Sequence, residues 1–381
     1  MIYIREQSHA FMLLQLLNVA GEFPASSLSI LGSERTLREL VLRMGRKQEI
    51  RIGWNGHTYD AQLLCVSGKR GAFRTIRLHR SALPILNELH PDALSHYLHA
   101  FRNHAFTGKR GDIERNHRVA EAIAMMLTSG IEARPYALPP LAASGRQIII
   151  PDTPSFYPAK MVKQQGGDAM NKTGFTRMAG MLMAPGLGYV VYNTRSNAMK
   201  WHGDGERKAM QQCEEVARRN AGVRDLRSSI LLGHTGSAAL ATLQAAAQRD
   251  GSAAFERIYE AIHFVPMQEG GKRMLRLLCV PELQAKLSAV LFPTRMRITG
   301  YADCDCDAMD NGKYILSHLD GDLARLLRFC RAAREDPTRR YEVLAFPFQA
   351  EYVKAADSVV SLRCIEMETV HRAVKQSILK E

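Results

Sequence analysis

The apolar residues nearest the amino terminus recur with the spacing of short helices. This spacing predicts a helix over Ser8–Ala20 that stops at Gly21, and a second over Ala25–Leu31 that stops at Gly32. A third helix is expected to begin at Ser33, because apolar residues then recur at positions i, i+3, i+4 and i+7. The residues of this third apolar face are Leu37, Leu40, Val41 and Met44.

Two hairpins are expected after the third helix, because strand-forming residues surround two turn signals. Glu49–Trp54 and His57–Val66 flank Asn55-Gly56, a strong two-residue turn signal. Ser67–Gly71 then turns the chain into a further strand over Ala72–Leu78. Three helices followed by a hairpin with a basic loop are typical of a winged helix-turn-helix domain, in which the loop touches DNA beside the third helix.

Basic residues occupy the polar face of the third helix and the loop of the second hairpin. A helix in a major groove needs such cations to contact phosphates and base edges. The candidate DNA-contacting residues are Arg35, Arg38, Arg43, Arg46, Lys47, Arg51, Lys69, Arg70 and Arg74. The first 80 residues hold twelve Lys and Arg against six Asp and Glu, nearly half of the chain's net charge of +13. This favours double-stranded DNA as the partner, with salt-dependent affinity; the alternative is a solvated face on an interaction module.

The expected organisation has three parts. A helix over Ser81–Leu89 closes the winged helix-turn-helix domain at residues 1–90. A helical connector follows over residues 91–134, with its main helix at Asp112–Ser129. Prolines and a glycine between Arg134 and Gly145 mark the boundary of an α/β domain over residues 135–381.

Strands and helices are expected to alternate in the second half of the chain. Strands are predicted over residues 147–150, 188–193, 229–233, 341–346 and 359–365, with further extended runs at 263–267 and 274–280. Helices are predicted over residues 205–220, 237–248, 253–262, 319–334 and 368–379. The fold class is therefore mixed, α+β or α/β.

One set of residues has the composition of a metal-dependent nuclease site. Such a site needs acidic residues that hold Mg²⁺ and a lysine that stabilises the charge developing on the phosphate. Asp152, after a predicted strand, and Glu206 and Lys208 supply these types in the right order. However, Glu206 and Lys208 fall at the start of a predicted helix, whereas the usual position is a strand. A nuclease or nickase with Mg²⁺ is therefore an alternative hypothesis, and no other cofactor is expected.

Other classes of chemistry find little support in the residues. The seven cysteines are an odd number and no secretory signal opens the chain, so reduced thiols in the cytoplasm are expected. Asp303–Gly312 resembles the start of a calcium loop, but Ala308 and Tyr314 stand where glycine and glutamate are required. The chain contains no phosphate-binding glycine loop and no apolar segment long enough for a membrane helix. No metal site is predicted.

The order of these features resembles the replication-relaxation family of plasmids and integrative conjugative elements. A winged helix-turn-helix is followed by a histidine-bearing helix at Asn116–Glu121 and by Pro151-Asp152 at a strand end. Tyr189–Thr194 and Met199–Trp201, leading into Glu206–Lys208, are similar to segments of proteins encoded beside conjugation genes. The likeness covers the first 120 or so residues best.

The resemblance implies double-stranded DNA binding in plasmid or conjugative-element replication, transfer or its control, beside other replication or conjugation proteins. It also implies a restriction-endonuclease-like second half, often with an incomplete catalytic site. A third hypothesis is a transcription or copy-number regulator whose α/β half senses a ligand or forms a homodimer. The first and third hypotheses share the basic amino-terminal surface as the DNA-binding element.

Overall fold

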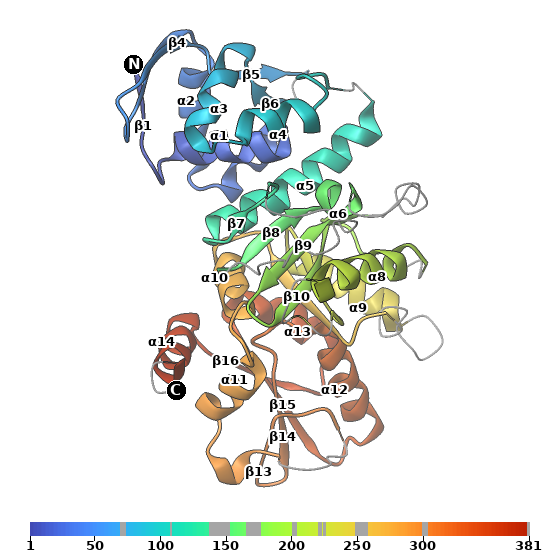
Figure 1. Cartoon of the computed structure of the whole chain (residues 1–381). Coiled ribbons are helices and arrows are strands. Elements are labelled where there is room, and N and C mark those ends of the chain that lie inside the picture. Colours follow the sequence, from blue (N-terminus) through green and yellow to red (C-terminus); the bar gives the residue numbers. More distant parts are fainter. Residues whose placement is uncertain are drawn as a thin grey trace. The chain divides into compact units, whose positions relative to one another are not determined.

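The computed structural model describes residues 1–68, 74–106, 109–136, 153–164, 177–199, 204–219, 223, 226–247, 258–298 and 304–378. The chain divides into two compact units. The first comprises Met1–Ser144 and Ser155–Gln165, and the second comprises Gly145–Pro154 and Gly166–Glu381. Both units combine helices with mixed sheets, which confirms the predicted mixed fold class of helices and strands (Figure 1).

The three predicted amino-terminal helices are present in the first unit. Helix α1 spans His9–Ala20; the Ser8 side chain accepts a hydrogen bond at its start, and Gly21 ends it at φ +75°. The second segment is a 3₁₀ helix, η1, over Ala25–Ile30. Helix α2 spans Glu34–Met44. Its buried side chains are Leu37, Val41 and Met44, as the apolar spacing predicts, while Leu40 is only partly buried.

Two small sheets surround these helices. One has the order β1-β3-β4, from Ile2–Ile4, Gln48–Ile52 and Thr58–Ala61, and β1 pairs in parallel with β3. The other is antiparallel with the order β2-β6-β5, from Glu22–Pro24, Thr75–Leu78 and Leu64–Ser67. Both expected hairpins are therefore present, as β3–β4 and β5–β6. Lys69 and Arg70, in the loop of the second hairpin, lie outside the described residues.

The strand expected over His57–Val66 is interrupted, and the interruption separates the two sheets. Leu63 leaves the first sheet and bonds to other elements: its N–H donates to the Met44 carbonyl at 2.9 Å, and its carbonyl accepts from His79 N–H at 2.9 Å. β4 and β5 are therefore separate strands, because the backbone N–H and carbonyl of Leu63 form their hydrogen bonds with residues that lie in neither strand. Pro24 lies in β2, directly before η1.

The rest of the first unit is mainly helical. It contains η2 at Arg80–Ile85, α3 at Leu86–Leu89, α4 at Ala93–Ala100, α5 at Arg110–Thr128, β7 at Glu132–Ala133, β8 at Ser155–Pro158 and α6 at Ala159–Gln164. Strands β7 and β8 pair in parallel. Helix α5 confirms the long helix predicted at Asp112–Ser129, and its side chains from Ala120 to Met126 are all buried.

Buried polar contacts fasten α5 to the sheet that contains the β5–β6 hairpin. The carboxylate of Glu22 accepts from Arg77 Nη2 at 2.6 Å and from Asn116 Nδ2 at 2.9 Å. One turn further along α5, Glu121 accepts from the Ser27 hydroxyl at 2.8 Å. Because Glu22 and Glu121 are each about 1 % exposed, these contacts specify how α5 packs as well as satisfying buried charge.

The second unit begins with a mixed sheet. Its order is β9-β10-β11-β12, from Met178–Ala184, Leu187–Arg195, Ser228–Gly233 and Ala261–Pro266. β9 and β10 are antiparallel, and β10, β11 and β12 are parallel to one another. Helix α8, Asp204–Arg219, packs on β9 and β10, and α9, Gly236–Ala247, packs on β11. These strands and helices confirm the predictions at 188–193, 205–220, 229–233 and 237–248.

A second sheet completes this unit. Its order is β13-β14-β15-β16, from Ala308–Asp310, Lys313–Ser317, Arg340–Ala345 and Ser361–Cys364. The helices around it are α10 at Glu269–Leu278, α11 at Leu283–Leu291, η3 at Thr294–Met296, α12 at Leu323–Glu335, η4 at Pro347–Gln349, α13 at Ala350–Ala356 and α14 at Met367–Ile378. The strands predicted at 341–346 and 359–365 and the closing helix are confirmed.

Two predictions in this unit are wrong, and one predicted helix is confirmed with a later start. The run 274–280 was expected to be extended, but Met274 to Leu278 belong to α10, with apolar residues buried at helical spacing. The helix expected over 253–262 is not found at 258–262, where β12 begins at Ala261. The helix expected over 319–334 begins only at Leu323. Residues 253–257 and the strand expected at 147–150 lie outside the described residues.

Before α12 the chain turns at Leu319 and Asp320 and then lies beside β12. Phe264 N–H donates to the Gly321 carbonyl at 2.9 Å, and Ile262 N–H donates to the Asp322 carboxylate at 3.1 Å. Gly321 has φ +70°, and a Cβ there would meet the Phe264 carbonyl oxygen at 2.7 Å. This close approach requires glycine, and it joins the second sheet of the unit to the edge strand of the first.

Candidate nucleic-acid interface

Helix α2 presents arginines on the face opposite its buried residues. The side chain of Arg35 is 91 % exposed and that of Arg38 is 65 % exposed. Each pairs with an acid of the same helix: Arg35 with Glu39 at 3.4 Å, and Arg38 with Glu34 at 2.5 Å. Exposed pairs of this kind contribute only about 0.2–1 kcal/mol, so both arginines can exchange these partners for phosphates at little cost.

The remaining candidate cations near α2 are also exposed. Arg43 donates from Nη2 to the Met1 carbonyl at 3.5 Å, and Arg46 follows just after the helix. Lys47 pairs with Asp60 of β4 at 2.8 Å, and this contact raises the pKa of the lysine. Arg51 is an exposed residue of β3. These cations are therefore accessible. Arg51 lies in the β1-β3-β4 sheet, and Lys47 directly precedes β3.

A groove lies between α2 and the β5–β6 hairpin. Its volume is about 500 Å³, and it brings Arg38 of α2 together with Arg74, which directly precedes β6. The other residues that line it are Ala25, Ser26, Leu28, Val41, Leu42, Val66 and Ile76. Among these described lining residues none is acidic, so the groove combines cationic and apolar side chains.

Leu42 is a feature of this surface that the sequence prediction missed. It is 61 % exposed, one turn after Arg38 and two turns after Arg35 on the same face of α2. The signal was present in the sequence: Leu42 falls among the arginines of the polar face and outside the apolar series that ends at Met44.

The residues of the nuclease hypothesis are not brought together in the described part of the chain. Asp152 lies outside the described residues. Glu206 and Lys208 are both on α8, two residues apart, so their side chains leave the helix in directions about 160° apart. Glu206 is 1 % exposed, whereas Lys208 is exposed. The two side chains therefore point in different directions.

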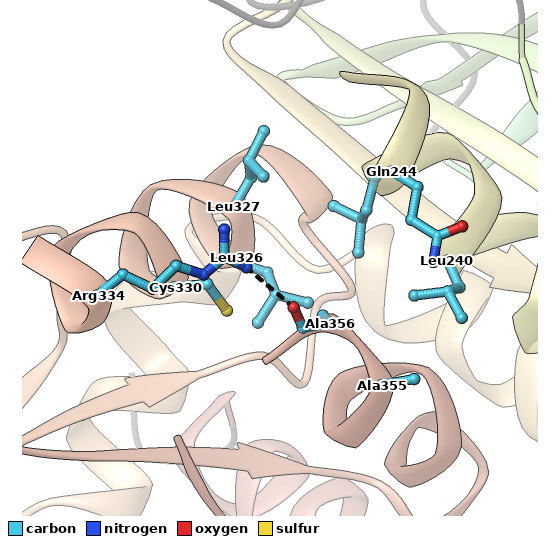
Figure 2. Close-up of a pocket in the computed structure, with 9 residues that line it drawn as sticks. Leu240, Gln244, Leu326, Leu327, Cys330, Arg334, Ala355 and Ala356 are labelled. Carbon is cyan, nitrogen blue, oxygen red and sulfur yellow. Dashed lines mark hydrogen bonds between the residues drawn. The ribbon is translucent and has the colours of Figure 1, made fainter. Parts of the chain in front are cut away.

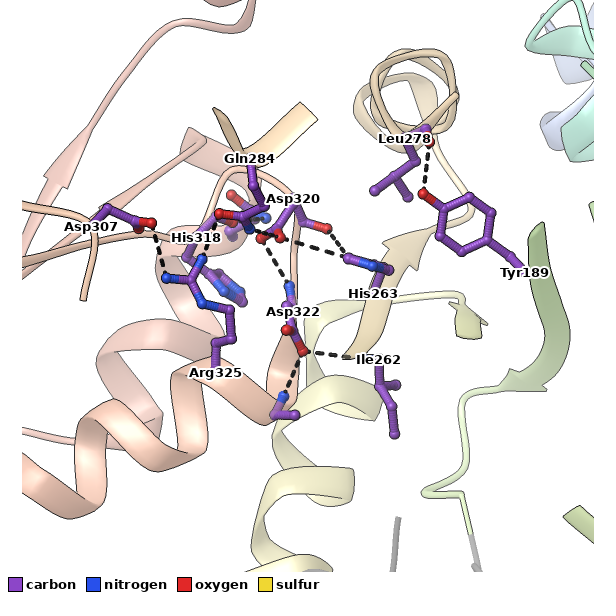
Figure 3. Close-up of polar contacts among 12 residues, drawn as sticks. Tyr189, Ile262, His263, Leu278, Gln284, Asp307, His318, Asp320, Asp322 and Arg325 are labelled. Atoms are coloured by element: carbon purple, nitrogen blue, oxygen red, sulfur yellow. Dashed lines mark hydrogen bonds and ion pairs between the residues drawn. The ribbon is translucent and has the colours of Figure 1, made fainter. Parts of the chain in front are cut away.

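A cavity of about 530 Å³ in the second unit has an acid-rich lining. It includes His263 of β12, Asp320 and Asp322 of the segment before α12, and Arg325 and Arg328 of α12. Figure 3 shows His263, Asp320, Asp322 and Arg325 in a network of polar contacts with one another and with neighbouring groups. His263 donates from Nδ1 to the Asp320 carbonyl at 3.0 Å, and Asp322 accepts from the backbone N–H of Ala324 at 2.9 Å.

Arg325 is the centre of this polar cluster. It donates to Asp305 at 3.0 Å, to Asp307 at 2.9 Å and to the Gln284 side-chain oxygen at 2.8 Å. Burial raises the pKa of Asp307, whereas for Asp305 the two arginines outweigh burial and lower the pKa. Gln284 in turn donates to the Asp320 carboxylate. These acids are satisfied by internal donors, so the cluster fastens α12 to its neighbours.

A smaller pocket of about 130 Å³ lies among α9, α12 and α13 (Figure 2). Apolar residues form most of its lining, and Arg334 at its rim donates to the Ala356 carbonyl at 3.0 Å. Cys330 lines it, but burial raises the pKa of this thiol to about 12, so it stays protonated near neutral pH. The pocket carries no arrangement for nucleophilic catalysis.

The described residues lack two further features. They contain no group of three or more His, Cys, Asp or Glu side chains arranged to hold a metal ion. None of the helices in these ranges has both the length and the apolar character needed to cross a bilayer.

Comparisons of the chain with protein-family models, with curated proteins and with solved structures found no match.

Proposed function

We propose that the first unit binds double-stranded DNA through α2 and the β5–β6 hairpin, as a winged helix-turn-helix. The order of elements supports this proposal: α1, β2, η1 and α2 are followed, after the β3–β4 insertion, by a hairpin whose strands pair as β2-β6-β5. In this arrangement α2 is the helix that enters the major groove, and the hairpin contacts the backbone beside it.

The observation that carries the proposal is the accessibility of the α2 arginines. Arg35 and Arg38 are held only by exposed pairs within their own helix, and Arg43 and Arg46 are exposed as well. Arginines buried in internal ion pairs would be unavailable to phosphates. The opposite face of α2 is fixed in the core by Leu37, so the helix is a rigid platform for these cations.

The wider role follows from the resemblance of the residues to the replication-relaxation family. It is DNA binding in the replication, transfer or regulation of a plasmid or conjugative element. Binding is favoured over hydrolysis, because Glu206 and Lys208 diverge on α8 and the polar cluster around Arg325 is internally satisfied. In this proposal the first unit is the part of the protein that contacts DNA.

The test is a titration of the full chain against a short duplex at several salt concentrations. The double variant Arg38→Ala/Arg43→Ala should bind at least tenfold more weakly and lose about 1–2 from the slope of log K against log salt. Arg363→Ala is the matched control, because Arg363 is a 56 % exposed arginine of the second unit that pairs with Glu342. Equal affinity and slope for the double variant and the wild type would reject the proposal.

A further inference from the structure

Two exposed apolar side chains border the groove beside α2. Leu42 is 61 % exposed and Val66, on β5, is 38 % exposed, and both line the groove that also holds Arg38 and Arg74. Single exposed apolar residues are ordinary on protein surfaces. Here two of them are gathered in one concavity, next to two arginines, on the surface proposed to meet DNA.

The position of Leu42 on α2 is specific. Residues four and seven apart lie on one face of a helix, so Arg35, Arg38 and Leu42 form a single stripe. A helix that lies in the major groove presents such a stripe to the edges of successive base pairs. In that position the arginines of the stripe can contact phosphates or guanine. The side chain of Leu42 can contact a methyl group on a base edge.

Only one apolar group is available on unmodified base edges in the major groove: the C5-methyl group of thymine. We propose that Leu42 contacts thymine methyl groups, with Val66 extending the apolar wall, and that this contact makes the protein prefer thymine-containing duplexes. This inference rests on the proposed function. The charge of the groove supports a nucleic-acid occupant, because its described lining contains two arginines and no acidic residue.

The test compares two duplexes that differ only by the methyl group. The full chain is titrated against alternating dA–dT and alternating dA–dU duplexes of equal length in the same buffer. Wild-type protein should bind the dA–dT duplex about four- to fifteenfold more tightly, the effect expected for one or two methyl groups removed from water.

The variant Leu42→Ala should lose most of this preference. Alanine favours a helix at least as well as leucine does, and Leu42 is exposed, so the variant is expected to fold. Val359→Ala removes an apolar side chain of similar exposure, 49 %, from the second unit, and it should keep the wild-type preference. Any difference in shape between the two duplexes acts on wild type and variants alike, so the loss of preference isolates the Leu42 contact.

The outcomes separate this inference from the function on which it rests. If the wild-type protein binds neither duplex, the proposed function fails. If it binds both with equal affinity, DNA binding stands and the thymine contact is rejected. If Leu42→Ala keeps the full preference for dA–dT, other residues or duplex shape read the methyl group, and the role of Leu42 is rejected.

Discussion

The arginines of α2 and those of α12 both face acidic side chains, but their surroundings are very different. Arg35 of α2 is 91 % exposed and meets one carboxylate at 3.4 Å. The side chain of Arg325 of α12 is 14 % exposed and meets Asp305, Asp307 and Gln284 within 3.0 Å. An exposed pair exchanges partners with solvent and ligands, whereas a buried cluster must stay intact for the fold to persist.

This contrast separates charge that is available for binding from charge that maintains structure. Counting Lys and Arg does not distinguish the two, since both helices are rich in arginine. The burial of each arginine and the number of its partners distinguish charge that is available for binding from charge that maintains structure. The comparison can be tested by removing individual groups and measuring which property is lost: the free energy of unfolding or the affinity for DNA.

The largest expected effect comes from Arg325→Ala. The substitution leaves Asp305 without one of its two arginines and Asp307 without its guanidinium partner, and both carboxylates are largely shielded from solvent. We expect the free energy of unfolding to fall by about 3–5 kcal/mol, because a buried charge loses its compensation. Urea-induced unfolding followed by circular dichroism measures this change.

Arg328→Ala is the control for this prediction. Arg328 bonds the same Asp305 at 2.7 Å, but its side chain is 38 % exposed. Its removal should lower the free energy of unfolding by only about 1 kcal/mol. Similar losses for the two variants would contradict the view that burial of Arg325 decides the effect.

A smaller effect is expected from acid, through His318. Burial lowers the pKa of this histidine to about 4, whereas the unfolded chain has a value near 6.5. Between these values the unfolded state takes up a proton that the folded state excludes, so stability falls as the pH drops from about 6.5 to about 4. The loss is at most about 3 kcal/mol. Asp322 opposes it below pH 6, because burial raises its pKa to about 6.

The variant His318→Gln tests this assignment. Glutamine does not titrate, and its amide can replace the contact of His318 Nε2 with the Tyr352 hydroxyl at 2.9 Å. The free energy of unfolding of the variant should therefore depend less steeply on pH between about 6.5 and 4. An unchanged slope would assign the acid sensitivity to other groups.

The smallest effect on stability is expected at the other end of the comparison, from Arg35→Ala. The pair with Glu39 is exposed, and alanine favours the helix, so the free energy of unfolding should change by less than about 0.5 kcal/mol. The same variant should bind duplex DNA more weakly. A loss of stability above about 1 kcal/mol would show that Arg35 has a structural role, and it would weaken the contrast with Arg325.

The parts of the fold that the sequence predicts are those determined by local signals. Ser8 and Gly21 bound α1 because capping depends on neighbouring residues, and the apolar spacing of α2 identifies its buried face. The run Met274–Val280 was misassigned because a short apolar run fits a buried strand as well as a buried helix. Only its packing against β12 decides between them.

The candidate surface was predicted in part for the same reason. Basic residues on a helix face are visible in the sequence, and Arg35 and Arg38 are exposed as expected. The groove that joins Arg38 to Arg74 depends on the approach of segments more than thirty residues apart, which spacing alone cannot give. Likewise, Asp320 and Asp322 fall within the helix expected over 319–334, and only their contacts with β12 explain why α12 begins later.

The path of the polypeptide between the two units has a practical consequence. Ser155–Gln165, which contains β8 and α6, belongs to the first unit although Gly145–Pro154 before it belongs to the second. A fragment that ends at Ser144 would leave β7 without the strand with which it pairs. A single cut in the gene therefore releases the first unit whole only if it falls after Gln165, and recombination at a breakpoint before Ser155 would not pass this unit intact to another protein.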